Sequence, residues 1–565
     1  MNRNMIIFII GSVAMILGWQ WAMNKYYPAP PVSDSQTIDG KATVVSGTAA
    51  TLVTPATAGS GAASTAPLAM GKASGASLKP APEQLVTVET KAYKAVLSSW
   101  GARFTSLQLN GLTMRKKDDI QTLDLIPEGD LPRFATVSLP GVDLGALSWT
   151  LLTKQPVIEN GQPTVRFAAR VPGLPLELVK AFSFDAEKPQ FNVKISLKNA
   201  SAQLMNLSPF SLQWGPNLGG DSVNNTRTRG IVQNAAVVQL DRSIERERAN
   251  NDTSSMDYSD PRWVALKNHY FVVGFFPASA AWNKAQIQHL GNANIAASLV
   301  ADGLSLAPGK SVDLDVLVYA GIQEYSTLKA FGKNFQGVVQ FEAYKLFEWL
   351  NPLCIALLYI MRWFHGVTGN WGVAIILLTL LVRAVMFYPS MKSMVSMRKM
   401  QTKMAAMQPR LDTIKKIYKD DAQKLNAEMM KLYKEYGVNP LGGCLPMLLQ
   451  IPIFFSLYGT LNAAYELRGA AFMWRWTDLT ASDPTYIFPL AMGISMFMQQ
   501  RMTPTNSSTM TDEQAQMQKM MLWMMPIMFT GMAIYLQWPM GLLLYWTASN
   551  SFGVAQQFAV NKAIK

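Results

Sequence analysis

Arg383 is the residue of this chain whose position most clearly points to chemistry. It lies inside the apolar run 371–388, and Thr379 stands one helical turn earlier on the same face. A charged side chain in the middle of a membrane span costs about 2.5–3.5 kcal/mol, so it normally faces water or a polar partner. The pair therefore predicts a wet, anion-attracting surface inside a membrane. The alternative is that Arg383 snorkels to the nearby cytoplasmic interface.

The surrounding apolar runs argue against acid–base or metal chemistry. Asp and Glu are absent from 441–464, 484–511 and 520–565, and the chain has only two cysteines and three histidines. A proton relay or metal site would need acids, histidines or cysteines gathered in these runs. No Ser/His/Asp set, Gly-rich phosphate loop or Cys-x-x-Cys is visible. We therefore expect neither an enzyme nor a bound cofactor, and we interpret His269 as a hydrogen-bonded core residue.

Apolar segments at both ends of the chain would position Arg383. Charged residues make up 15% of the chain, compared with about 25% in typical soluble domains. Segment length and hydropathy predict six spans in total, five of them in a core. The predicted spans are an uncleaved signal anchor within 1–27 and the segments 369–390, 439–463, 484–502, 519–538 and 540–560.

Charge distribution orients these spans. The net charge of +13 gathers largely between Lys392 and Lys434, and Lys/Arg enrichment beside a span marks its cytoplasmic side rather than nucleic-acid binding. With the N-terminus inside, the loop 503–518 and the tail 561–565 are also cytoplasmic. Residues 331–368 are predicted to form an amphipathic helix lying in the outer interface. A further span over 341–366 is the alternative, and it would break the charge agreement.

Two other regions complete the organisation. Residues 28–82 are rich in Ala, Thr, Ser, Gly and Pro and are predicted to be a flexible linker. Residues 83–330 alternate apolar and polar positions in short runs, which predicts an antiparallel β-sandwich outside the membrane. The expected fold class is therefore mixed: a polytopic α-helical membrane core joined to a large β-sandwich.

The cytoplasmic segment 391–438 is predicted to be a helical hairpin. Its methionines step by three or four residues, and they are Met394, Met397, Met400, Met404 and Met407. These methionines either hold the two helices together or offer a soft, adaptable surface to varied apolar segments.

Three motifs resemble the signatures of the YidC family of membrane protein insertases. They are Asn-Pro-Leu-Gly-Gly-Cys-Leu-Pro at 439–446, Gly-Asn-Trp-Gly at 369–372, and the segment 539–550. The resemblance is specific over roughly 341–560 and looser over the β domain. It implies a bacterial inner-membrane protein with a periplasmic β domain that is mutarotase-like and largely dispensable for insertion.

The resemblance also implies a function. Nascent inner-membrane proteins would be inserted and helped to fold, alone or beside the Sec translocon, with the ribosome or targeting factors as further partners. Arg383 would lie in a hydrophilic groove open to the cytoplasm and the lipid, attracting acidic client segments. Thr379, Tyr545 and Trp546 would line this groove, although a tyrosine is expected at 546, and the hairpin would receive clients. The alternative function is a transporter with an anion site at Arg383, which should show internal repeats that we do not find.

Overall fold

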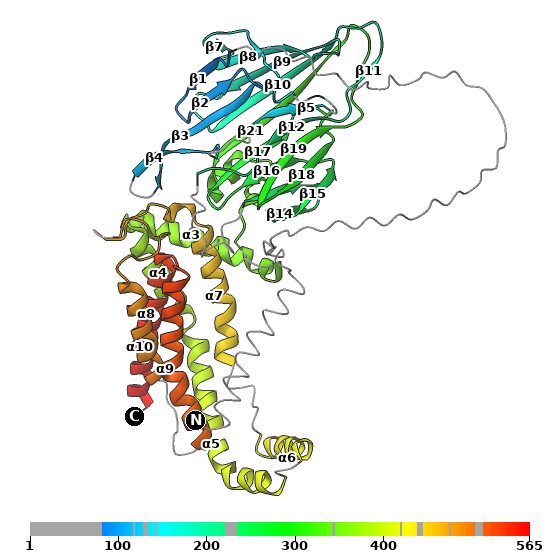
Figure 1. The fold of residues 1–565 in the computed structure, drawn as a ribbon. Helices are drawn as coiled ribbons and strands as arrows, with labels where there is room; N and C mark the ends of the chain where they lie inside the picture. The colour runs from blue at the N-terminus through cyan, green and yellow to red at the C-terminus, as the bar shows by residue number, and fades with distance from the viewer. Residues whose placement is uncertain are drawn as a thin grey trace, which may run out of the picture.

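The computed structural model describes two regions, a β domain and a helical region, which lie end to end (Figure 1). The predicted anchor over 1–27, the linker up to residue 81 and the loop residues 503–511 lie outside the described residues. The described residues are 82–116, 119–127, 134–139, 142, 144–220, 234–341, 345–418, 421–437, 445–473, 476–502 and 512–564.

The β domain is built from antiparallel sheets. The largest sheet has the order β14 (Ile244–Arg248), β13 (Ala235–Gln239), β16 (Trp263–Lys267), β17 (Phe271–Pro277), β21 (Ser311–Ile322), β10 (Gln190–Asn199), β9 (Leu176–Phe184), β8 (Gln162–Arg170) and β6 (Thr150–Leu151), with β7 (Val157–Glu159) also paired to β8. The second sheet has the order β15 (Thr253–Ser259), β18 (Lys284–Gly291), β19 (Asn294–Ala301), β12 (Phe210–Trp214) and β5 (Thr136–Ser138). Smaller sheets are formed by β1 (Leu85–Glu89), β2 (Tyr93–Ser98), β3 (Arg103–Lys116) and β4 (Asp119–Asp124), and by β11 (Met205–Asn206) with β20 (Ser305–Leu306).

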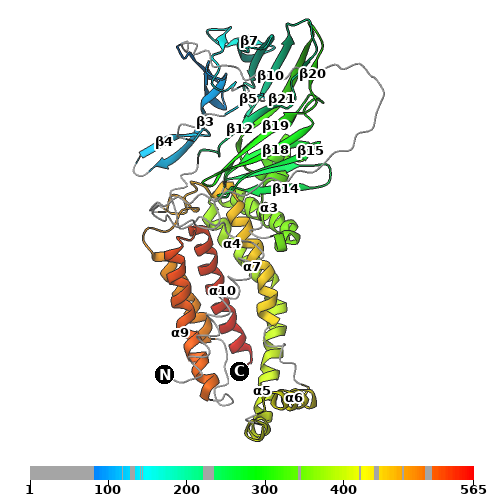
Figure 2. The ribbon, with the colours of Figure 1, turned by 45° about the vertical axis from the view of Figure 1, so that its right-hand side comes forward.

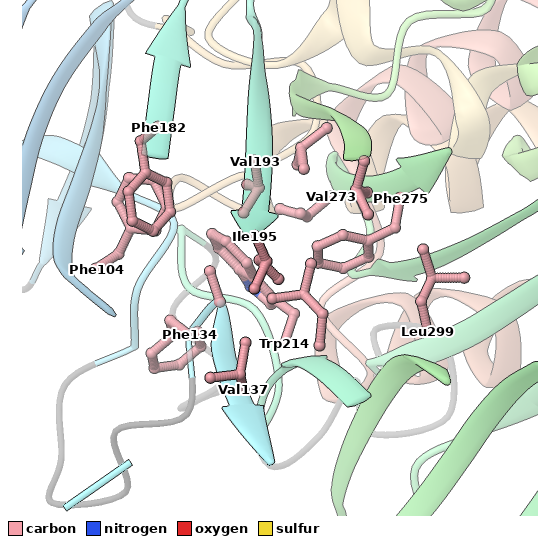
Figure 3. Close-up of a cluster of buried hydrophobic side chains, with 14 of the residues drawn as sticks. Phe104, Phe134, Val137, Phe182, Val193, Ile195, Trp214, Val273, Phe275 and Leu299 are labelled. Carbon is pink, nitrogen blue, oxygen red and sulfur yellow. The ribbon is translucent and has the colours of Figure 1, made fainter. Parts of the chain in front are cut away.

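Strand alternation places an aromatic core between these sheets. In β9 every second residue is buried, as period-two alternation requires. Figure 3 shows Phe104, Phe182 and Trp214 converging on this core, and the ring centroids of Phe104 and Phe182 lie 5.3 Å apart. Burying each such side chain contributes roughly 1.5–3 kcal/mol. The predicted antiparallel β-sandwich is confirmed.

The helical region follows the β domain in the chain. Its first elements are α2 (Tyr325–Phe331), η1 (Phe335–Val338), η2 (Lys345–Leu350), α3 (Asn351–Thr368), α4 (Trp371–Val385), α5 (Phe387–Ile417) and α6 (Ala422–Glu435). The later elements are α7 (Leu445–Ala463), η4 (Tyr465–Leu467), α8 (Ile487–Met502), α9 (Asp512–Tyr535) and α10 (Met540–Ile564). Within this region α10 packs against α8 and α4, α9 against α8, and α3 against α4 and α7.

The Gly-Asn-Trp-Gly motif has a local structural explanation. Gly369 ends α3 in the left-handed conformation with φ of 67°, which glycine adopts without a steric penalty. The side chain of Asn370 then caps α4 by accepting a hydrogen bond from the backbone N–H of Val373 at 3.1 Å. The motif therefore turns the chain from one helix directly into the helix that carries Arg383.

Two predicted boundaries differ in the structure. The helix expected over 331–368 is divided into η1, η2 and α3, and Pro352 lies at the start of α3, where proline favours the beginning of a helix. The predicted border between a span and a hairpin at 390/391 is not a break, because α5 starts at Phe387 and continues to Ile417. One long helix therefore forms the start of the hairpin and follows α4 with only Met386 between them.

Membrane-crossing potential is uneven along the described helices. By length and mean hydropathy, the helical stretch Glu348–Thr368 is the one described segment long and apolar enough to cross a membrane, whereas Trp371–Val385 is apolar but shorter. The segment predicted to lie flat thus meets the simple length criterion. Figures 1 and 2 place α3 at the end of the helical region nearest the β strands.

Candidate functional site

Arg383 reaches from α4 to α10. Its Nε donates to the Oγ of Ser549 at 3.0 Å and its Nη2 donates to the same oxygen at 2.7 Å. Ser549 is almost fully buried, whereas Arg383 is partly exposed. In the part of the chain that the structure describes, no acidic side chain forms an ion pair with Arg383. A neutral hydroxyl therefore holds this guanidinium while leaving its positive charge unneutralised.

Tyr545 and Thr379 lie beside this pair. Tyr545 is buried one turn before Ser549 on the same face of α10. Thr379 is buried one turn before Arg383, and its Oγ1 donates to the backbone carbonyl of Ile375 at 2.7 Å. The hydroxyl of Thr379 is thus satisfied by its own helix. The structure bonds Arg383 to Ser549, one turn after Tyr545, and Ser549 is not among the site residues predicted from the sequence.

Trp546 belongs to a different set of contacts. Its ring stacks on Phe454 of α7 with centroids 5.2 Å apart and on Trp538 at 5.0 Å. Phe529 of α9 meets the same ring edge-on at 5.6 Å. Offset and edge-on aromatic pairs of this kind contribute about 0.5–1.5 kcal/mol each beyond area burial. Trp546 therefore joins three helices, while its neighbour Tyr545 lies on the face of α10 that carries Ser549.

More polar side chains lie inside the helical region, between α8 and its neighbours. The Nδ2 of Asn550 donates to the Oγ of Ser495 at 3.3 Å, and both residues are buried. On the same helix, Leu490, Ile494 and Met498 are about half exposed or more. This distribution, polar inside and apolar outside, is the reverse of that in a soluble domain.

α9 shows the same apolar exterior. Its large exposed side chains are Met521, Trp523, Met524, Ile527, Met528 and Tyr535. A contiguous apolar surface of this size is unstable in water and is typical of a surface that faces lipid or another protein.

The hairpin of α5 and α6 holds one of the predicted methionines in its interior. Met407 is fully buried with Leu411 and Leu432, and Arg410 forms an ion pair of 2.8 Å with Glu435 across the two helices. Met407 thus holds the hairpin together. The other predicted methionines lie earlier along α5, and they are Met394, Met397, Met400 and Met404.

The helical region is joined to the β domain by a partly buried charge cluster. The Nε of Arg362 on α3 donates to Glu466 of η4 at 2.6 Å, and its Nη2 lies 3.0 Å from Glu324, just before α2. A second contact between the two regions joins His269 of the β domain to the backbone of Asn462 in α7. Burial, followed by the charge of Lys267, lowers the pKa of His269 to about 4, so this histidine is neutral at physiological pH.

An apolar helical exterior, polar groups inside and a β-sandwich at one end together define an integral membrane protein with a large domain outside the bilayer. The model of the YidC periplasmic domain matches residues 85–352, and the model of the 60Kd inner membrane protein matches residues 363–565. Together these two matches cover both regions of the structure. The chain belongs to the YidC family of membrane protein insertases.

Individual relatives support this assignment. The membrane protein insertase YidC of Citrifermentans bemidjiense is 32% identical over 486 residues, covering 85% of this chain and 86% of that protein. The YidC insertase of Aromatoleum aromaticum is 28% identical and covers 100% of this chain and 98% of that protein. A galactose mutarotase-like protein from Lactobacillus casei covers 42% of this chain at 12% identity, with a TM-score of 0.28, and supports no conclusion.

The family assignment confirms several expectations from the sequence. The protein belongs to a family of insertases rather than enzymes, resides in the inner membrane and has a periplasmic β-sandwich. Its clients are nascent membrane proteins, as the name of the family indicates.

Proposed function

We propose that this protein inserts inner-membrane proteins, and helps them fold, through a polar groove beside α4 and α10 that opens to the cytoplasm. The observation that carries the proposal is the bonding of Arg383 to the neutral Ser549, with no acidic partner among the described residues. A fixed cation of this kind attracts acidic residues in a client segment and disfavours basic ones.

A polar groove lowers the free-energy cost of moving a hydrophilic client segment across the bilayer. A hydrophilic client segment loses the hydration of its backbone and side chains when it enters hydrocarbon, at a cost of several kcal/mol for each unsatisfied group. Polar side chains reaching partway across shorten the dry part of this path. Partitioning of the apolar client span into lipid then drives its release from the groove. Insertion by this route requires no nucleotide.

Each predicted site residue receives a role in the proposal. Arg383 attracts the acidic client segment, Tyr545 and Thr379 form polar walls beside it, and Trp546 supplies an aromatic surface. Clients first meet the hairpin, on the part of α5 that carries the methionines Met394, Met397, Met400 and Met404.

The proposed membrane placement keeps α3 along the outer interface. Arg362 lies within α3 and bonds Glu324 at the end of the β domain and Glu466 after α7, so the helix is held at the level of the periplasmic domain. Exposed aromatic side chains on and beside α3, including Trp349, Tyr359 and Trp363, suit the headgroup region of a bilayer. The spans are then the anchor within 1–27 together with α4, α7, α8, α9 and α10.

The proposed partners follow from this placement. With the N-terminus, the hairpin and the C-terminal tail in the cytoplasm, nascent chains arrive from the ribosome or from targeting factors. Lateral opening toward lipid allows the protein to act alone or beside the Sec translocon.

Reconstitution tests the proposal directly. Vesicles containing the purified full-length chain should insert a small single-span client with an acidic N-terminal tail, measured as protection of that tail from external protease. If empty vesicles protect the tail equally well, the proposal is wrong. Flux of small anions through the same vesicles, without client insertion, would favour the transporter alternative.

A further inference from the structure

Ser549 occupies a position that decides where the guanidinium of Arg383 points. Its single oxygen accepts both the Nε–H and one Nη2–H of Arg383. This contact joins α4 to α10 across 166 positions of the sequence. We infer that Ser549 is the positioning residue that aims Arg383 at acidic client segments, an inference that rests on the proposed function above.

The hydrogen-bonding capacity of the Ser549 hydroxyl supports this role. A serine hydroxyl has two acceptor lone pairs and one donor hydrogen. Arg383 occupies the acceptor side, and Tyr545 lies one turn earlier on the same face of α10. Ser549 is 3% exposed, so water does not compete effectively for these bonds. Among the described residues, the oxygen of Ser549 accepts hydrogen bonds from Arg383 alone.

Arg383 has N–H donors that do not bond Ser549. A guanidinium carries five N–H groups in a rigid planar fork. Two of them point to Ser549, which leaves both Nη1 hydrogens and one Nη2 hydrogen. The outer edge between Nη1 and Nη2 is the edge that binds a carboxylate through two parallel hydrogen bonds. Ser549 therefore holds the Nε–Nη2 side of the fork, and no described residue takes up the Nη1–Nη2 edge by a hydrogen bond or an ion pair.

The neutrality of serine is essential to the inference. An aspartate at position 549 would hold the guanidinium equally well but would neutralise its charge and compete with the client. A serine orients the fork without cancelling the attraction. It also restricts a long side chain that would otherwise lose conformational entropy each time a client bound.

Substitutions at Ser549 test the inference with a charge-specific readout. Two clients are compared, one with an acidic translocated tail and one in which each acid is replaced by its amide. The measured quantity is the ratio of their insertion rates into vesicles containing the full-length protein. Ser549→Ala should lower the acid-to-amide ratio by about threefold to fivefold, with little change for the amide client. Ser549→Thr retains a hydroxyl and should preserve the ratio.

A matched control lies two residues further along the same helix. Ser551 is exposed, and its hydroxyl donates to the backbone carbonyl of Thr547 at 2.8 Å, so Ser551→Ala should leave the ratio unchanged. In the Arg383→Ala background, Ser549→Ala should have no further effect on the ratio.

The outcomes separate this inference from the proposed function. An unchanged ratio in Ser549→Ala, or an equal loss for both clients, overturns the positioning role, because the second result would reflect general packing. If Arg383→Ala itself leaves the ratio unchanged, the proposed role of the arginine fails as well. If Arg383→Ala abolishes the preference while Ser549→Ala does not, only the positioning role is lost.

Discussion

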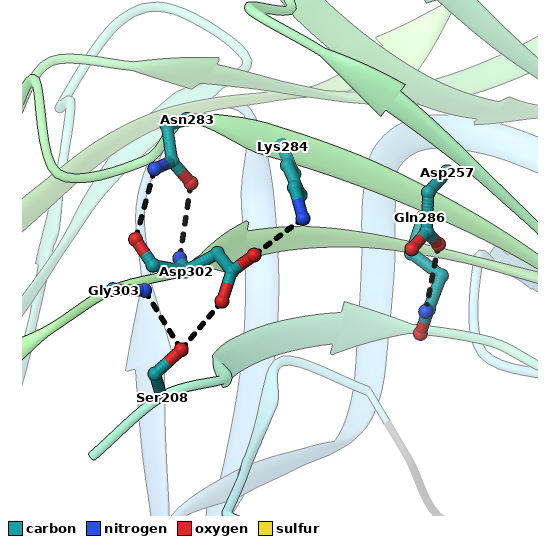
Figure 4. Close-up of polar contacts among 7 residues, drawn as sticks. All are labelled: Ser208, Asp257, Asn283, Lys284, Gln286, Asp302 and Gly303. Atoms are coloured by element: carbon teal, nitrogen blue, oxygen red, sulfur yellow. Dashed lines mark hydrogen bonds and ion pairs between the residues drawn. The ribbon is translucent and has the colours of Figure 1, made fainter. Parts of the chain in front are cut away.

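Charged side chains in the β domain pair with one another at its surface. Lys194 and Asp313 lie 2.7 Å apart and are each about half exposed. Lys284 pairs with Asp302, which also accepts a hydrogen bond from Ser208, as Figure 4 shows. In the helical region, by contrast, Arg383 is held by a serine rather than a carboxylate.

Apolar side chains are buried in the β domain but exposed on the helices. The β domain gathers its aromatic residues in a closed core, including Phe104, Phe182 and Trp214. In α8 and α9, large apolar side chains cover the outside, and polar pairs such as Asn550 and Ser495 are buried. The two regions are therefore built for two different solvents, and the exposure of a residue means something different in each.

Two isoleucines of equal exposure provide the sharpest test of this contrast. Ile158 in β7 is 67% exposed and Ile527 in α9 is 66% exposed. If α9 faces lipid, Ile527→Asp should cost about 3 kcal/mol, because a carboxylate at mid-span must enter hydrocarbon. The cost is measured as the apparent insertion free energy of segment 519–538 in a translocon-based assay.

The β domain supplies the control for this measurement. Ile158→Asp should change the free energy of unfolding of the domain by less than about 0.5 kcal/mol, as expected for a water-exposed site. Urea unfolding followed by tryptophan fluorescence measures the effect. Equal, small costs for both substitutions would contradict a lipid-facing α9.

Arg383 should be the most sensitive polar residue of the helical region. Arg383→Ala should slow insertion of an acidic-tailed client by about ten- to a hundredfold, the value of a charge-assisted hydrogen bond that is lost. Arg383→Lys keeps the charge and one donor toward Ser549 but lacks the two-donor edge, so its loss should not exceed the roughly threefold to fivefold loss expected for Ser549→Ala. Protease protection in reconstituted vesicles measures both variants.

The matched comparison is again in the β domain. Arg170 is an exposed arginine paired with Glu177 at 2.9 Å, and Arg170→Ala should leave insertion unchanged. Equal activity of all three proteins would reduce Arg383 to a snorkelling residue.

Local patterns were sufficient to predict much of the fold. Alternation of buried and exposed residues, as in β9, identified the antiparallel sandwich because the side-chain period of a strand is two. The Gly-Asn-Trp-Gly motif indicated the family, and its capping geometry explains why those residues stand there. In both cases the information lies within a few consecutive residues.

The contacts of the site could not be predicted in the same way. The bond from Arg383 to Ser549 joins helices far apart in the sequence, and periodicity within one helix says nothing about its partner helix. One signal was present, because Ser549 follows Tyr545 by four residues and so shares its helix face. Likewise, the spacing of Met407 fitted either a buried or an exposed methionine, and only packing placed it in the hairpin interior.

Lys180 is a cation of the β domain that is more deeply buried than Arg383 and, like Arg383, has no ion-pair partner among the described residues. It is fully buried in β9, its Nζ donates to the backbone carbonyl of Ala102 at 2.9 Å and also to that of Ala135, and burial lowers its pKa to about 7. Between this value and the unfolded pKa, the unfolded chain binds more protons. Raising the pH therefore stabilises the folded domain in that window, by up to about 1 kcal/mol per pH unit.

A pH series in urea tests this expectation for the full-length protein. Wild type should gain stability over Lys180→Met between pH 7.5 and pH 9, with the difference read from unfolding midpoints. Lys194→Met is the control, because the ion pair with Asp313 raises the pKa of Lys194 and keeps it protonated across the same range. Parallel pH profiles for wild type and Lys180→Met would contradict the assignment.

The smallest expected effect lies where the two regions meet. Burial, followed by the charge of Lys267, lowers the pKa of His269 to about 4, while an unfolded histidine titrates near 6.5. The burial of neutral His269 is therefore fully stabilising above about pH 6.5, and this stabilisation is lost as the pH falls toward 4, because the unfolded chain then binds the proton more readily. His269 retains some exposure to solvent, so the loss should be less than about 1 kcal/mol per pH unit. Hydrogen exchange of 268–271 and 462–468, corrected for intrinsic rates, should accelerate between pH 7 and pH 5 in wild type. His269→Asn keeps a hydrogen-bond donor but does not titrate, so its exchange rates should not accelerate over this range. The same acceleration in this variant would show that another group causes the pH dependence, and that the junction between the water-facing and lipid-facing regions does not depend on this histidine.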